Sequence, residues 1–156
     1  LYLMRHSKAL TSSKDSSDFN RPLHPQGELD ARVMANRLLD GAKIPEMFIS
    51  SNAKRAFSTA LHVLKELQIS KESLITNTNL YLASAQSILT VINNSNKSLN
   101  SVCIIGHNPG ISELIYLLTG TSINMTTSAI ATIEIDCNNW SEVFHGCGQL
   151  VNYDQP

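Results

Sequence analysis

The sequence has few cysteines, almost no net charge and no long apolar run. Its three cysteines are an odd number without metal-type spacing, so they do not form a disulfide framework and they favour a reducing compartment. A net charge of -1 excludes the basic field that recruits nucleic acid or a membrane surface. No apolar run approaches the roughly 18 residues of a membrane span, and no signal peptide is visible. We therefore expect a cytoplasmic protein without nucleic-acid or membrane partners, in which any anion site is made by a few placed cations.

The chain also lacks internal repeats, domain linkers and low-complexity tracts beyond short Ser and Asn clusters. Its 156 residues suit one domain with a substantial core. Hydrophobic residues make up 42% and charged residues 16%, which is ordinary for a folded soluble protein. The sequence therefore predicts a single domain over residues 1–156.

Short apolar runs alternate with helical patterns along most of the chain. Unbroken apolar runs, typical of strands buried on both faces, lie at residues 1–4, 47–49 and 101–106. Apolar residues with helical spacing lie at residues 27–39, 53–67, 85–92 and 111–118. Residues 74–82 are only weakly extended and were not counted as a strand. The spacing thus predicts the order β, α, β, α, α, β, α up to Gly120.

After Gly120 the pattern changes to strict alternation. Ala129, Ala131 and Ile133 alternate with polar residues, which indicates a half-exposed strand, and residues 140–151 are expected to return as one or two further strands. An alternating β and α order predicts an α/β protein, with a mostly parallel sheet between helices on both faces, a three-layer α/β/α sandwich. The last strands leave room for an antiparallel edge.

Polar groups follow three of the predicted strand-to-helix junctions. Arg5 and His6 come directly after the first strand, Arg55 lies in the first turn of the second helix, and His107 follows the strand over 101–106. Strand carboxyl ends in a parallel sheet share one edge, where ligands bind. Each residue alone is typical of a surface or capping position, but four such groups at one edge indicate a site. Two guanidinium groups and free helix N–H groups suit phosphate oxygens.

These residues lie in motifs that resemble those of the histidine phosphatase superfamily, which includes the cofactor-dependent phosphoglycerate mutases. Leu3-Met4-Arg5-His6-Ser7 resembles its Arg-His-Gly signature. Ser51-Asn52-Ala53-Lys54-Arg55-Ala56-Phe57-Ser58-Thr59-Ala60 resembles its Ser-x-x-x-Arg-Ala-x-x-Thr-Ala helix. Ile105-Gly106-His107-Asn108 resembles its second histidine motif. The order of the motifs spans the whole chain and implies a phosphoglycerate mutase-like fold.

Further motifs resemble more narrowly the short SixA-type phosphohistidine phosphatases. They are Arg21-Pro22-Leu23, Gly27 and Thr127-Ser128-Ala129-Ile130. The resemblance implies that His6 is a nucleophile that forms a phosphohistidine intermediate, while Arg5, Arg55 and His107 hold the phosphoryl oxygens. It implies substrate contacts from Arg21 and Asn108 and requires no metal or other cofactor. For Arg21, a surface ion pair with Asp18 is an equally weighted alternative.

Two features depart from the family pattern. Ser7 replaces the usual Gly, and its hydroxyl is expected either to be tolerated or to reach the pocket wall. No carboxylate lies between Glu72 and Glu113, where larger members carry a general acid. An alkoxide leaving group needs a proton, whereas a phosphoramidate expels imidazole more easily, so phosphohistidine is favoured. Other sources of an acid stay open, namely Asp15, Asp18 and Glu28.

The sequence therefore predicts a phosphatase acting on phosphohistidine in proteins, because the brief loops leave a shallow site open to a protein substrate. A phosphatase for small phosphoesters and a non-catalytic phosphohistidine-binding module are the alternatives. Cys103 does not begin a cysteine-phosphatase loop, because Pro109 occupies the position where a Cys-x5-Arg loop needs arginine. The predicted partner is a phosphorylated protein or a small phosphorylated molecule.

Overall fold

The computed structural model describes residues 1–11, 17–41 and 44–156. One six-stranded sheet has the strand order β3-β2-β4-β1-β5-β6. The strands are β1 (Tyr2–Arg5), β2 (Met47–Ser51), β3 (Leu74–Asn77), β4 (Val102–Gly106), β5 (Ile130–Ile135) and β6 (Gly148–Asp154). The main helices are α1 (Pro25–Asp40), α2 (Lys54–Glu66), α3 (Ala85–Asn93) and α4 (Gly110–Thr119).

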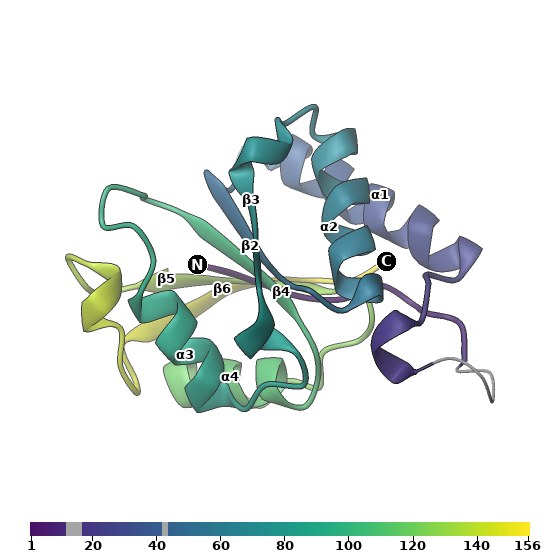
Figure 1. The fold of residues 1–156 in the computed structure, drawn as a ribbon. Coiled ribbons are helices and arrows are strands. Elements are labelled where there is room, and N and C mark those ends of the chain that lie inside the picture. The colour runs from purple at the N-terminus through teal and green to yellow at the C-terminus, as the bar shows by residue number, and fades with distance from the viewer. Residues whose placement is uncertain (12–16, 42–43) are drawn as a thin grey trace.

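Helices cover both faces of this sheet, with α1 and α2 on one face and α3 and α4 on the other (Figure 1). The first four strands in sheet order are parallel, whereas β5 and β6 pair antiparallel. The predicted three-layer α/β fold with a mostly parallel sheet and an antiparallel edge is therefore confirmed.

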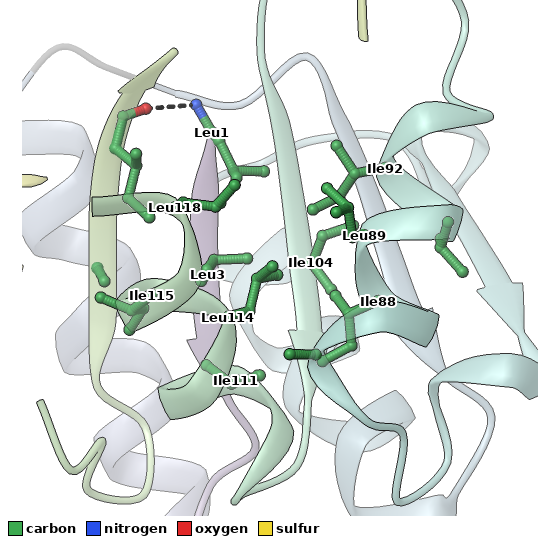
Figure 2. Close-up of a cluster of buried hydrophobic side chains, with 14 of the residues drawn as sticks. Leu1, Leu3, Ile88, Leu89, Ile92, Ile104, Ile111, Leu114, Ile115 and Leu118 are labelled. Atoms are coloured by element: carbon green, nitrogen blue, oxygen red, sulfur yellow. Dashed lines mark hydrogen bonds between the residues drawn. The ribbon is translucent and has the colours of Figure 1, made fainter. Parts of the chain in front are cut away.

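Alternating side chains of the inner strands enter two separate cores. Leu1 and Leu3 of the first strand pack toward α3 and α4, whereas Tyr2 and Met4 pack toward α1 and α2. Figure 2 shows the first of these cores, where side chains of α3 and α4 meet Leu3 and Ile104. Because β1 and β4 are buried on both faces, they read in the sequence as unbroken apolar runs.

The register brings three strand ends to one level. Ser50 of β2 pairs with Ile105 of β4, which pairs with Met4 of β1. The residues that follow these three positions therefore leave the sheet side by side. The fold thus places the polar junctions predicted from the sequence at one edge of the sheet.

Two elements differ from the sequence prediction. Residues 74–82 contain a real strand, β3, followed by a 3-10 helix, η3 (Thr78–Leu80), so the sheet has one parallel strand more than predicted. β3 is an edge strand with Ile75 50% exposed, which removes the apolar signal of a buried strand. Residues 140–151 form a short 3-10 helix, η4 (Trp140–Glu142), and only one strand, β6, which continues beyond the predicted end.

In the described ranges, the helices are too short and too polar to cross a bilayer.

Candidate active site

A cavity of about 410 Å³ opens at the shared strand edge. All six residues predicted for the site line it: Arg5, His6, Arg21, Arg55, His107 and Asn108. Five others complete the lining: Lys8, Ala9, Asp18, Leu82 and Thr127. The structure therefore brings together residues that are more than 100 positions apart in the chain.

Backbone hydrogen bonds fix the segment that carries Arg5 and His6. The His6 N–H donates to the carbonyl of Gly106 at 3.0 Å, which continues the β1–β4 ladder beyond the end of the strand. From the antiparallel side, the Ser128 N–H lies 3.2 Å from the Arg5 carbonyl and 3.3 Å from that of His6. The neighbouring Ser7 N–H donates to Thr59 Oγ1 at 2.9 Å. His6 therefore stands on backbone that is held from both sides.

The hydrogen bonds of His6 determine which ring nitrogen carries the proton. Nδ1 lies 2.8 Å from the Ser7 carbonyl oxygen. A carbonyl can only accept, so Nδ1 must carry the hydrogen and Nε2 must hold the free lone pair. Nε2 accepts a hydrogen bond from Arg55 Nε at 3.1 Å. Burial lowers the pKa of His6 to about 4, with the charges of Arg55 and Arg5 acting in the same direction, so the ring is neutral at neutral pH.

Arg55 is a buried arginine, with only 3% of its surface exposed. Arg55 lies off the apolar stripe of α2 and is nevertheless buried, because the 3-10 helix η1 (Asp18–Asn20) lies against it. Its two terminal nitrogens donate to Asp18, NH1 to the backbone oxygen at 2.7 Å and NH2 to Oδ2 at 3.0 Å. Thr59 Oγ1 donates to the Arg55 carbonyl at 2.7 Å, one turn along the same helix. The guanidinium group thus joins His6 to Asp18.

His107 lies beside His6, with their ring centroids 5.0 Å apart. Its Nε2 forms a hydrogen bond of 2.9 Å with the hydroxyl of Ser51 at the end of β2. Burial is the largest cause that lowers the pKa of His107 to about 3, and the nearby His6 and Arg55 act in the same direction. Like His6, it is therefore an uncharged imidazole at neutral pH.

Two buried nitrogens of cavity-lining side chains have no hydrogen-bond partner within the described part of the chain. They are Arg5 Nε and His107 Nδ1. The other end of the same guanidinium is held, since Arg5 NH1 donates to the Met125 carbonyl at 2.8 Å. Buried polar groups are normally paired, so these two nitrogens suit an oxygen-rich anion. The cavity can accept a phosphoryl group with its oxygens on Arg5 and His107.

Sequence reasoning gave too little weight to Asp18 and missed Tyr81 entirely. Asp18, in the 3-10 helix η1 (Asp18–Asn20), accepts from Arg21 NH1 at 3.0 Å and from the Tyr81 hydroxyl at 2.9 Å, besides Arg55. The hydrogen bond from Arg21 is the largest cause that lowers the pKa of Asp18 to about 2. Tyr81 also packs edge-on against His107, with centroids 5.6 Å apart. No periodicity or motif marks either residue, so the sequence carried no signal for this contact.

The structure also locates the remaining candidate residues. Arg21 lines the cavity and forms the predicted ion pair with Asp18, and its contact with a substrate stays a prediction. Asn108 lines the cavity, but its amide nitrogen donates to Asn124 Oδ1 and to the Met125 carbonyl, which ties it to the neighbouring loop. Glu28 lies on α1 and faces His62 of α2 at 3.9 Å, outside the cavity lining. Asp15 lies outside the described residues.

A cluster of three or more His, Cys, Asp and Glu side chains suited to a metal ion does not occur in residues 1–11, 17–41 and 44–156.

Comparison with known sequences agrees with the motifs. The chain is 27% identical to an uncharacterized chloroplastic protein of Arabidopsis thaliana, over 92% of this chain and 70% of that protein. It is 26% identical to an uncharacterized protein of Mycobacterium tuberculosis, over 98% of this chain and 99% of that protein. These relatives cover nearly the whole chain, so the similarity is not confined to the segment around His6.

Comparison with solved structures points to the same group. The protein histidine phosphatase SixA in complex with tungstate superposes with a TM-score of 0.84 at 28% identity, over 99% of this chain and 96% of that one. SixA from Agrobacterium tumefaciens superposes with a TM-score of 0.85 at 23% identity, over 99% and 96%, which shows the shared fold. The resemblance to SixA-type proteins is thereby confirmed. A model of the histidine phosphatase superfamily (branch 1) matches residues 1–80, and the chain belongs to this superfamily.

Proposed function

We propose that residues 1–156 form one metal-independent phosphatase domain that removes phosphate from phosphohistidine in proteins through a covalent intermediate on His6. The observation that carries this proposal is the state of His6. Its ring is neutral, and the lone pair of Nε2 faces a cavity lined by three arginines. A nucleophile that is already deprotonated needs no base to activate it.

In the first step, the Nε2 lone pair of His6 attacks phosphorus and forms a new N–P bond. The bond from phosphorus to the substrate's leaving group breaks, and its electron pair departs with that group. Arg55 Nε, which donates to His6 Nε2, transfers its hydrogen bond to a phosphoryl oxygen. Arg5 and His107 take the other equatorial oxygens through their unpaired nitrogens. These groups stabilise the charge that develops on the oxygens.

His107 can serve as a neutral donor because of Ser51. When the Ser51 hydroxyl donates to Nε2, the ring proton lies on Nδ1, the nitrogen that has no protein partner. Nδ1–H then donates to a phosphoryl oxygen without the ring having to be charged. A low pKa of His107 is therefore compatible with oxyanion binding.

In the second step, water attacks phosphorus and the N–P bond to His6 breaks. Throughout the cycle the Ser7 carbonyl retains the proton on Nδ1. With that proton in place, Nε2 leaves phosphorus with its electron pair as neutral imidazole rather than as an anion. The water proton passes to solvent, inorganic phosphate is released and His6 returns to its starting tautomer.

The substrate preference follows from the state of the carboxylate that the described residues bring to the cavity lining. Asp18 is the carboxylate in the cavity lining, and with a pKa of about 2 it is ionised at neutral pH. An alkyl phosphate expels a poor leaving group that needs a proton in the transition state. A phosphohistidine that is protonated on its second ring nitrogen leaves as neutral imidazole without help. Exposed Lys8 and Leu82 at the cavity leave it open to a histidine on another protein.

The experiment compares wild type, His6→Ala and the control His145→Ala, which replaces an exposed histidine far along the chain. Each variant is incubated separately with a phosphohistidine-bearing protein, p-nitrophenyl phosphate and sugar phosphates. Every reaction is run in the presence and in the absence of EDTA. We expect His6→Ala to lose roughly 10⁴-fold or more of its activity, as loss of a nucleophile does, while His145→Ala and EDTA change little. Acid-labile labelled phosphate should be trapped on wild type and not on His6→Ala.

Each alternative has its own outcome. Hydrolysis that survives in His6→Ala would refute the covalent mechanism, and loss of activity in EDTA would refute metal independence. Faster turnover of sugar phosphates than of phosphohistidine would favour small phosphoesters as substrates. Binding of the phosphohistidine protein without phosphate release would identify a binding module instead of an enzyme.

A further inference from the structure

A negatively charged side chain lies among the cations of the proposed phosphoryl site. Asp18 Oδ1 accepts from Arg21, and Asp18 Oδ2 accepts from both Arg55 and Tyr81. A site that only had to attract phosphate would gain nothing from this carboxylate, since like charges repel. Its function must therefore concern the groups to which it is bonded.

The hydrogen bonds divide the Arg55 guanidinium into two edges. The terminal edge, formed by NH1 and NH2, is occupied by the backbone and side-chain oxygens of Asp18. On the other edge, Nε donates to His6 Nε2 at 3.1 Å. A guanidinium is planar and its donors are rigidly related, so fixing one edge fixes the direction of the other.

We propose that Asp18 is a positioning residue that aims Arg55 Nε–H at the nucleophilic nitrogen of His6. The kinetic part of this inference rests on the proposed function, whereas the geometric part does not. Arg55 Nε lies next to His6 Nε2, the nitrogen that attacks phosphorus. The direction of the Arg55 guanidinium therefore determines where the phosphoryl group lies relative to the attacking nitrogen. A misplacement of roughly 1 Å in such a group lowers the reaction rate about 10²-fold.

Asp18 is itself held in place from two other elements. Arg21 donates a hydrogen bond from Nε to the Leu10 carbonyl at 2.6 Å and another from Nη1 to Asp18 Oδ1. These two bonds connect η1 to the segment that follows β1. Tyr81 comes from the turn after η3, packs edge-on against Phe19 with centroids 5.0 Å apart, and lies under the Arg55 guanidinium at 5.9 Å. The carboxylate is thus a junction between three segments, unlike an isolated surface ion pair.

The test uses Asp18→Ala, which removes both the charge and the side-chain acceptor, and Asp18→Asn, which keeps one acceptor oxygen without the charge. The matched control is Asp154→Asn, which disrupts an exposed Asp–Arg pair with Arg37 outside the cavity. The first readout is the ¹⁵N resonance of His6 Nε2 in protein without substrate, since that resonance responds to a donated hydrogen bond. The second is kcat and KM for phosphohistidine and for phenyl phosphates with different leaving groups.

We expect the Nε2 resonance to move in Asp18→Ala, to move less in Asp18→Asn, and to stay in Asp154→Asn. For Asp18→Ala, kcat should fall about 10- to 100-fold to the same extent for good and poor leaving groups. KM should not rise, because the lost carboxylate repels the substrate.

Two results would overturn the inference. An unchanged Nε2 resonance in Asp18→Ala would show that Asp18 does not direct Arg55, whether or not the chain is a phosphatase. A loss of kcat confined to poor leaving groups would show that Asp18 supplies a proton instead. Failure of the chain to hydrolyse any substrate would refute the proposed function and leave the resonance test of the geometry intact.

Discussion

The core between the sheet and α3 and α4 and the strand-end cavity are buried to a similar depth but built from opposite chemistry. Figure 2 shows the first region, where only apolar side chains meet. Among the residues that the structure describes, the buried polar and charged ones line the cavity or are connected to its lining by hydrogen bonds: His6, Ser7, Ser50, Ser51, Arg55, Thr59, His107 and Ser128. Hydrogen bonds join each of them to another residue of that set.

This difference separates stability from chemistry. Apolar burial is worth about 25 cal/mol per Å² and needs no direction, whereas buried polar groups cost free energy unless each is paired. Among the described residues, three buried side-chain atoms are unpaired, and two of them, Arg5 Nε and His107 Nδ1, belong to residues that line the cavity, whereas Asn52 does not line it. We therefore expect substitutions in the core to change unfolding free energy, and substitutions in the cavity to change the rate of phosphate release.

The largest change in stability is expected from Leu114→Ala in the core of Figure 2. Leu114 is fully buried on α4, and removing its side chain should cost about 2–5 kcal/mol, through lost transfer free energy and the cavity left behind. Urea unfolding measures this cost. The control is Leu29→Ala on α1, where the side chain is 52% exposed and the change should stay within about 0.5 kcal/mol. Activity per folded Leu114→Ala molecule should equal that of wild type, and a specific loss of kcat would contradict the separation.

The largest change in rate short of replacing His6 is expected from Arg55→Lys. A lysine keeps the charge but cannot donate to His6 Nε2 and to both Asp18 oxygens at once. We expect kcat/KM for phosphohistidine to fall roughly 10²- to 10³-fold per folded molecule. Arg37→Lys, at an exposed arginine that also has an aspartate partner, is the matched control and should retain activity. Equal kcat/KM values for the two variants would show that Arg55 does not take part in the reaction.

Acid should lower the free energy of unfolding through the two histidines of the cavity. Burial lowers the pKa of His6 to about 4 and that of His107 to about 3, against about 6.5 in an unfolded chain. Below pH 6.5 the unfolded chain binds protons that the folded protein does not, so stability is full above pH 6.5 and is lost as the pH falls toward 4. The slope should reach up to about 1.4 kcal/mol per pH unit for each histidine.

Urea unfolding between pH 7 and 4.5 measures this slope. His6→Gln should flatten it, because one of the two histidines with a lowered pKa is gone. His145→Gln, at an exposed position, should leave it unchanged. An equal slope in wild type and His6→Gln would mean that His6 titrates normally in the folded protein.

The same comparison explains what the sequence could predict. Strands β1, β2 and β4 are buried on both faces, so their apolar runs were readable, and the residues that follow them were placed at one edge by topology alone. β3 was missed because Ile75 faces solvent at the edge of the sheet. An unbroken apolar run in the sequence indicates a strand that is buried on both faces. An edge strand is partly exposed, so it lacks such a run.

The contacts of Asp18 with Arg55 and Tyr81 could not be predicted by the same means. It meets Arg55 across 37 positions and Tyr81 across 63. Both Asp18 and Tyr81 lie in or beside 3-10 helices, where no periodicity marks a face. The identity of Arg55's partner depends on how η1 folds back over α2, which is a tertiary property. The four junction residues needed only strand order, whereas this carboxylate needed side-chain positions.

The smallest effect on the rate of phosphate release is expected at Ser7, the residue that replaces the family's glycine. Ser7 is fully buried, and Ser128 Oγ donates to its hydroxyl at 2.6 Å, so this hydroxyl pairs with the turn before β5, and Ser7 does not line the cavity. Ser7→Ala leaves the Ser128 hydroxyl without its partner, and we expect a cost of about 1–3 kcal/mol in urea unfolding. In Ser7→Ala with Ser128→Ala both partners are gone, so most of that cost should be recovered. Activity should change little in either variant, because His6 depends on the backbone carbonyl and N–H of Ser7. A large loss of kcat in Ser7→Ala would mean that the hydroxyl pair also orients the nucleophile.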